Sequence, residues 1–171
     1  MRKVLIIDTS ILCIWLKVPK MEACGTERDK WNFARVDEYI QKEIKESTTL
    51  VLPLATIIET GNHIAQSSGN RYELAQALAK IMSDAADEQS PWAAFTDQSV
   101  LWEAENLKKL ASEWPKLASE QISIGDATIK TVAEYYTQAG FQVEILTGDS
   151  GLKAYEPTTS VPTPRRRRRS S

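Results

Sequence analysis

Four acidic residues stand where elements of regular structure are expected to begin or end. Asp8 and Asp149 each follow an apolar run, whereas Glu59 and Asp126 lie near the starts of segments with helical periodicity. Carboxylate oxygens are the ligands that hard divalent cations such as Mg²⁺ and Mn²⁺ prefer, and such a cation can activate a bound water. Without a cation, clustered carboxylates repel one another, so a cluster of this kind indicates a metal site.

Each acid also has a purely structural interpretation. Asp8 could cap the following helix, Asp126 could complete a capping box, and Asp149 could serve the Gly-rich turn around it. Glu59 could belong to a solvated helix face. Capping does not explain why four acids should reach the same place, so the metal-site interpretation is favoured for the set.

The segments that must position these acids alternate between strand and helix patterns. Apolar runs predict three strands, at residues 4–7, 48–52 and 141–147. Helical spacing predicts helices at residues 9–15, 26–45, 54–66, 71–86, 100–114, 123–139 and 150–157, with a loop at 19–25. This alternation predicts an α/β fold with a parallel sheet covered on both faces. Strand ends and the starts of the following helices then share one sheet edge, where all four acids can converge.

Length and composition bound the class of protein. The 171 residues, 42% hydrophobic and 26% charged, indicate one soluble domain at 1–156. The Pro-, Thr-, Ser- and Arg-rich segment 157–171 is expected to be a disordered tail. No apolar stretch reaches the roughly 20 residues that span a bilayer, so no membrane association is expected. Cys13 and Cys24 form no CxxC pair, and with a single histidine they exclude a zinc site and favour a cytoplasmic location.

The charge is unevenly distributed. The formal net charge is −2, and without the five arginines Arg165–Arg169 it would be −7. An acidic body that handles a polyanion needs bound cations or a basic appendage. The sequence offers both.

Taken together, four short motifs resemble the PIN-domain nucleases, in the order of that family. They read I-I-D-T-S-I-L, I-I-E-T-G-N-H-I, I-G-D-A-T-I and I-L-T-G-D-S-G-L. The resemblance covers roughly residues 1–156 and implies a three-layer α/β/α sandwich and Mg²⁺- or Mn²⁺-dependent hydrolysis of RNA. It implies that the metal-site and catalytic carboxylates are Asp8, Glu59, Asp126 and Asp149. The small hydroxyl residues that flank such a site match Thr9, Ser10 and Thr147.

Other candidates for substrate contacts have position as their only support. Asn62, His63 and Arg71 could contact phosphates, although a solvated helix residue is the simpler interpretation of His63. Of the five tryptophans, Trp92 is the one expected in a loop, so it is the candidate for stacking on a base.

These observations predict a metal-dependent nuclease, most simply an endoribonuclease acting on single-stranded or structured RNA. The alternatives are a non-cleaving PIN-like scaffold that binds RNA or protein, and a flap-type DNA nuclease. A phosphatase with Asp8 as nucleophile ranks last, because Ser10 stands where such enzymes usually carry a second acid. Many family members are toxins of toxin–antitoxin pairs, which would imply a protein inhibitor as partner, and self-association is compatible with the class. This chain differs from the compact toxins in its long segment between Glu59 and Asp126 and in its arginine tail.

Deleting residues 157–171 should weaken nucleic-acid binding and flatten its salt dependence without abolishing turnover at low salt. Five phosphate contacts would contribute roughly −3.5 to −4.5 to the slope of log K against log salt. Binding titrations of the full and truncated chains across salt concentrations measure this slope. An unchanged slope after truncation would mean that the tail does not bind the substrate.

Overall fold

The fold is α/β, with a three-stranded parallel sheet at its centre. The computed structural model describes residues 1–158; the arginine run and nearly all of the predicted tail lie outside the described residues. In chain order the elements are β1 (Lys3–Ile7), α1 (Thr9–Trp15), β2 (Ala23–Thr26), β3 (Asp29–Asn32), α2 (Phe33–Lys45), β4 (Thr49–Val51), α3 (Leu54–Gln66), α4 (Arg71–Ala86), the 3₁₀ helix η1 (Phe95–Trp102), α5 (Ala104–Ser119), α6 (Ile124–Gln138), β5 (Gln142–Leu146) and α7 (Ser150–Lys153).

Strand β1 is the centre of the sheet, in the order β4-β1-β5. Both neighbours run parallel to it, with Leu5 opposite Leu50 on one side and opposite Glu144 on the other. The four apolar residues 4–7 are completely buried. They do not alternate with polar residues because both faces of the strand are covered, which confirms the predicted parallel sheet.

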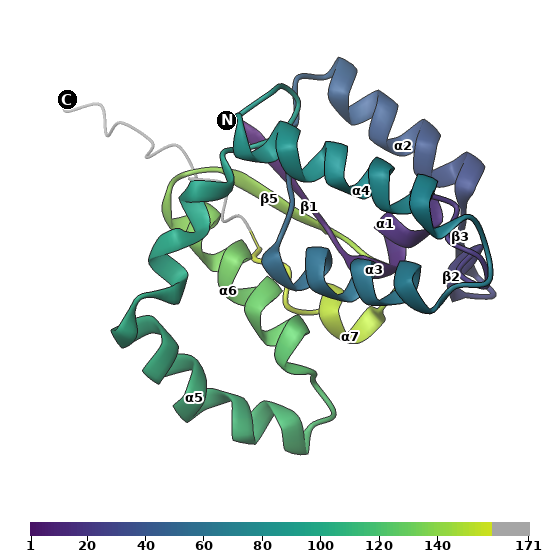
Figure 1. Ribbon diagram of the computed structural model, residues 1–171. Helices are drawn as coiled ribbons and strands as arrows, with labels where there is room; N and C mark the ends of the chain where they lie inside the picture. The colour runs from purple at the N-terminus through teal and green to yellow at the C-terminus, as the bar shows by residue number, and fades with distance from the viewer. Residues whose placement is uncertain (159–171) are drawn as a thin grey trace, which may run out of the picture.

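The two sheet faces belong to separate apolar clusters. Leu5 and Ile7 pack with residues of α1, α2, α3 and α4, whereas Val4 and Ile6 pack with residues of α6. Figure 1 shows α2 and α4 on one side of β1 and β5, with α6 on the other. This layering is compatible with an α/β/α sandwich.

Both outer edges of the short sheet are closed. On the β4 side, Leu50 exchanges hydrogen bonds with the segment 91–93, each of 2.8 Å. On the β5 side, the Ile145 N–H donates to Oε2 of Glu156 at 2.8 Å, and Nζ of Lys153 donates to the Ile145 carbonyl at 3.0 Å. These bonds occupy the central backbone groups through which a further strand would pair.

Residues 23–32 form a β-hairpin, where the sequence pattern predicted a loop and the start of a helix. Helix α2 therefore begins at Phe33 and not after Thr26, with Asn32 as its N-cap, accepting the Arg35 N–H at 3.0 Å. Cys24 pairs with Trp31 across the hairpin. The hairpin is mostly exposed and shows no alternation of apolar and polar residues, so its sequence carries no strand pattern.

Helix α5 also differs from its predicted bounds. Residues 95–102 form η1, and α5 continues through Pro115 to Ser119 instead of ending at the proline. Proline leaves one carbonyl of the preceding turn without its donor. Because no residue of α5 is buried, water can satisfy that carbonyl.

Trp92 is not available to stack on a base, as the sequence had suggested. Its side chain is 7% exposed, and its ring lies 6.5 Å from that of Trp15. The backbone bridge to Leu50 holds this loop against the sheet and buries the ring. In the part of the chain that the structure describes, no helix has the length and apolarity needed to cross a membrane.

Gln98 joins η1 to the sheet. Its side chain is buried, and Nε2 donates to the Leu52 carbonyl at 2.8 Å. Replacing Gln98 by alanine should lower the free energy of unfolding by about 1–3 kcal/mol, because the buried carbonyl loses its donor. Urea titration measures this loss. Gln76→Ala, on the exposed face of α4, is the matched control, and an equal effect of both variants would contradict a role for this hydrogen bond.

Candidate active site

Asp8 lies at the carboxyl end of β1 with its side chain turned toward β5. It occupies the N-cap position of α1, yet its carboxylate makes no cap hydrogen bond. Instead Oδ2 accepts the hydroxyls of Ser10 at 2.8 Å and Thr147 at 2.7 Å. The capping interpretation is therefore wrong for this residue. A 6% exposed carboxylate that accepts two hydroxyl hydrogen bonds is held in one orientation.

Glu59 approaches the same edge from α3. Its Oε2 accepts the Thr9 hydroxyl at 3.0 Å. Its Oε1 occupies the space that a side chain would take at Gly125, where an added Cβ would overlap with it. The glycine in the first turn of α6 is what lets the Glu59 carboxylate reach between the two helices.

Asp126 is the residue that connects all four acids. The hydroxyl oxygen of Ser123 accepts its backbone N–H at 3.0 Å, so the predicted N-cap of α6 is confirmed. Burial raises the pKa of the Asp126 carboxyl, and the negative charges of Asp8, Asp149 and Glu59 raise it further. The hydrogen bond from Ser123 acts in the opposite direction but is outweighed. Asp8, Asp149 and Glu59 therefore lie close enough to Asp126 to disfavour its ionisation.

Asp149 serves partly as a cap. One of its carboxylate oxygens, Oδ1, accepts the backbone N–H groups of Gly151 at 2.7 Å and Leu152 at 3.3 Å. This confirms its structural role in the turn that opens α7. Its second oxygen takes no part in these bonds, and the side chain is exposed.

The three predicted hydroxyl residues all contact the acids. Thr147 donates to Asp8, and its oxygen accepts the Asp149 N–H at 3.0 Å, so that it bridges two of the acids. Ser10 donates to Asp8 and accepts the Gly148 N–H at 3.3 Å. With Thr9 on Glu59, these hydroxyls orient carboxylates without neutralising their charge.

Cys24 is a neighbour of the site that the sequence did not reveal. Its sulfur lies where a side chain at Gly148 would stand. Burial raises the pKa of the thiol, and the charge of Asp8 adds to this effect. The thiol therefore adds no further negative charge at neutral pH. The residue comes from the unpredicted hairpin, so no sequence signal placed it here.

The candidates for phosphate contacts lie outside this hydrogen-bonded group. Asn62 and His63 are exposed on α3, about one turn beyond Glu59. Arg71 donates from Nε to the Ser67 carbonyl at 2.8 Å, at the end of α3. The structure thus gives Arg71 a role in closing the turn between α3 and α4.

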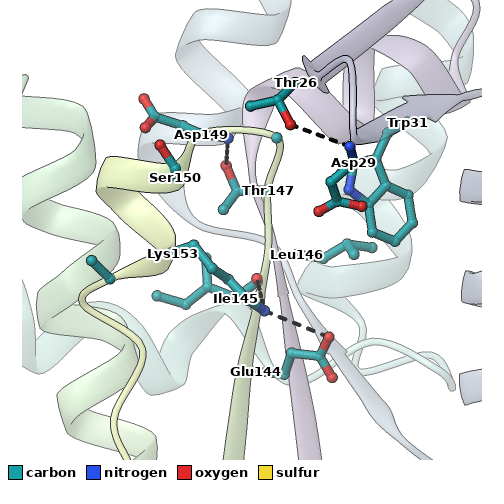
Figure 2. Close-up of a pocket in the computed structure, with 12 residues that line it drawn as sticks. Thr26, Asp29, Trp31, Glu144, Ile145, Leu146, Thr147, Asp149, Ser150 and Lys153 are labelled. Atoms are coloured by element: carbon teal, nitrogen blue, oxygen red, sulfur yellow. Dashed lines mark hydrogen bonds and ion pairs between the residues drawn. The ribbon is translucent and has the colours of Figure 1, made fainter.

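A hollow lies beside the acids, along β5. It encloses about 500 Å³ between the β2–β3 hairpin and α7, and Asp149 is the one acid of the four on its wall. Figure 2 shows Lys153 pointing toward Ile145 and Glu144, with Trp31 on the opposite side. Because Lys153 pairs with Glu144 at 3.7 Å and with Glu156 at 2.6 Å, its positive charge is already compensated.

The donor set fits a hard cation by its chemistry. Within residues 1–158, none of the four acids pairs with a lysine, arginine or histidine side chain. Over the same residues, no group of three or more His, Cys, Asp or Glu side chains is disposed to hold a metal ion. Mg²⁺ is commonly held through one or two carboxylates while it keeps several waters. The residues therefore fit such a hydrated cation, not a closed cage of protein ligands.

Comparison of the chain with family models, curated proteins and solved structures finds no match. The function has to be argued from the site itself.

Asp126→Asn should make the metal-free protein more stable, because it removes one of four mutually repelling charges. A purely capping role predicts the opposite sign, since a charge in the first turn of a helix stabilises it by about 0.3–1 kcal/mol. Mg²⁺ should raise the stability of the wild type more than that of the variant, because a cation bound to the native state stabilises it by mass action. Thermal melts of both proteins in EDTA and in excess Mg²⁺ measure these differences.

The pH dependence provides the control for Asp126→Asn. Because the pKa is raised in the folded state, ionisation of Asp126 destabilises the fold as the pH rises through that pKa. The gain from asparagine should therefore be full above the folded-state pKa and vanish below the ordinary value of 3.8. A variant that melts lower than wild type in EDTA and gains as much from Mg²⁺ would identify Asp126 as a cap alone.

Proposed function

We propose that this chain is a metal-dependent nuclease with a PIN-like fold, and that it acts as an endoribonuclease. The observation that carries the proposal is the group of oriented carboxylates at the end of β1: Ser10 and Thr147 donate to Asp8, and Thr9 donates to Glu59, whose Oε1 lies against Gly125. Burial raises the pKa of the adjoining Asp126, and the charges of Asp8, Asp149 and Glu59 raise it further. These acids lie up to 141 positions apart in the sequence yet share one sheet edge. Capping accounts for Asp149 at the start of α7 but not for Asp8, which makes no cap hydrogen bond, or for Glu59, which lies inside α3. Binding of a divalent cation would give the four acids a common role.

One or two of the carboxylates of Asp8, Glu59, Asp126 and Asp149 would hold a hydrated Mg²⁺ or Mn²⁺. A cation bound there supplies charge stabilisation at the scissile phosphate and lowers the pKa of a bound water. The chain's own residues prepare the site. Donation of two hydroxyls to Oδ2 fixes the Asp8 carboxylate, and the Thr9 hydroxyl fixes that of Glu59. Orientation in advance lets these groups act without rearranging during the reaction.

Asp126 has a second role in this proposal. The pKa of its carboxyl is raised, first because burial disfavours the charged form and then because ionisation adds a charge beside three others. Cation binding at the cluster is therefore expected to release a proton from this group as it binds. The resemblance to PIN-domain nucleases supports RNA as the substrate, and DNA is the alternative that the experiment below includes.

The purified protein should cleave RNA only when Mg²⁺ or Mn²⁺ is present, and Asp8→Asn should reduce cleavage to background while the fold is kept. The metal dependence and the loss of cleavage in Asp8→Asn are expected because Ser10 and Thr147 orient the Asp8 carboxylate at the proposed cation site. Mixed RNA and DNA oligonucleotides are incubated with each protein in EDTA, Mg²⁺ and Mn²⁺, and the products are resolved by length. Circular dichroism checks that the variant is folded.

Asp87→Asn is the matched control, since Asp87 is exposed at the end of α4. It should cleave like the wild type. Cleavage that persists in EDTA, or at full rate in Asp8→Asn, would contradict a metal-dependent mechanism. Cleavage of DNA alone would keep the mechanism and replace the substrate.

A further inference from the structure

An apolar groove lies against the acidic cluster, between α3, η1, α5 and α6. It encloses about 230 Å³, and its wall is almost entirely apolar. Four large apolar side chains open onto it although they are exposed to solvent. Their exposed fractions are 54% for Ile58, 40% for Trp102, 49% for Leu107 and 52% for Ile124. Apolar residues gathered in one hollow, not scattered singly, indicate a binding surface.

The chain topology leaves this groove open. Helix α5 contacts η1 and α6 but buries none of its own residues. Figure 1 shows α5 standing apart from the sheet, beside α6. The buried residues of α3 are Thr56, Thr60 and Ile64, so Ile58 lies on the other side of this helix, where it faces the groove.

The groove and the acidic cluster share a wall. Glu59 and Gly125 line the groove, and these are the two residues whose atoms meet at the acid site. Asp126 follows Gly125 directly. A molecule seated in the groove therefore lies next to any phosphate held at the carboxylates.

The size and chemistry of the groove select its occupant. At about 30 Å³ per water molecule, 230 Å³ corresponds to roughly eight waters. That volume accommodates one flat ring system. The Thr128 hydroxyl on the wall already donates to the Gly125 carbonyl at 2.7 Å. The groove therefore offers apolar and aromatic surface with little capacity to read hydrogen-bonding groups.

We propose that this groove binds one unstacked nucleobase adjoining the scissile phosphate, with Trp102 as its stacking partner. The inference rests on the proposed nuclease function and specifies its substrate class: a single strand, because a base within a duplex cannot leave the stack without loss of pairing. Stacking on an aromatic ring is tolerant of sequence, since every base has a π-face. The enzyme should then prefer single strands without a strong preference among bases at this position.

The test compares Trp102→Ala and Trp102→Phe with wild type on single-stranded RNA oligonucleotides. Trp102→Ala should lower kcat/KM by about 5- to 150-fold, the range found for loss of one base–aromatic stack. Trp102→Phe should keep most of the activity. Tyr72→Ala, an exposed aromatic on α4 outside the groove, is the matched control and should match wild type. Substrates with a single abasic position, moved along the strand, should lose cleavage at one position next to the scissile bond.

If Trp102 stacks on the missing base, the effects of Trp102→Ala and of the abasic substrate should not add. At that one position, Trp102→Ala should lose nothing further when the base is removed. Equal losses for the abasic substrate in wild type and in Trp102→Ala would overturn the proposal. So would a wild-type dimer that becomes a monomer in Trp102→Ala, measured by sedimentation, because a second copy would then cover the groove.

A binding measurement separates this inference from the nuclease proposal. Fluorescence anisotropy of a labelled single-stranded oligonucleotide with a non-hydrolysable backbone, in Mg²⁺, needs no catalysis. Weaker binding by Trp102→Ala than by wild type and Tyr72→Ala would support the groove even if no cleavage were found. Normal metal-dependent cleavage with equal binding by all three proteins would overturn the proposed base site and leave the nuclease proposal standing.

Discussion

Electrostatic repulsion among four carboxylates is the constraint on which the rest of this structure depends. Asp126 is half-buried, and three neighbouring acids oppose its ionisation. In the described part of the chain no basic side chain pairs with any of the four. Hydroxyl donors orient Asp8 and Glu59 but cannot cancel their charge. The fold therefore maintains an unfavourable arrangement that a bound divalent cation would make favourable.

The parallel sheet is what holds that arrangement in place. Burial on both faces fixes β1, and its pairing with β5 brings Asp8 beside Thr147. Helices α3 and α6 then deliver Glu59 and Asp126, with Gly125 providing the close approach. Because the sheet edges are closed, the strands cannot be extended by pairing at their centres. The one large element left without a buried face is α5, and it forms the wall of the apolar groove.

The sequence was sufficient to predict the fold and the site where local pattern and topology agree. Apolar runs located the three strands. The rule that strand ends share an edge predicted that the four acids lie near one another, and Asp126 is affected by the charges of the other three. The hairpin at 23–32 could not be predicted because its residues are exposed and show no alternation. The burial of Trp92 depends on a backbone bridge to β4, which no local pattern records. The apolar spacing of α3 suggested that Ile58 belongs to its buried face, whereas the buried residues are Thr56, Thr60 and Ile64.

Direct titration of Mn²⁺ into the protein tests most directly whether the carboxylates form a cation site. Isothermal titration calorimetry at two buffer ionisation enthalpies gives the affinity and the number of protons released. We expect saturable binding to the wild type with release of a fraction of a proton, and binding weakened at least tenfold in Asp8→Asn. Asp87→Asn should bind as the wild type does. Absence of saturable binding to the wild type at millimolar Mn²⁺, or equal affinity in Asp8→Asn, would contradict a metal site at this sheet edge.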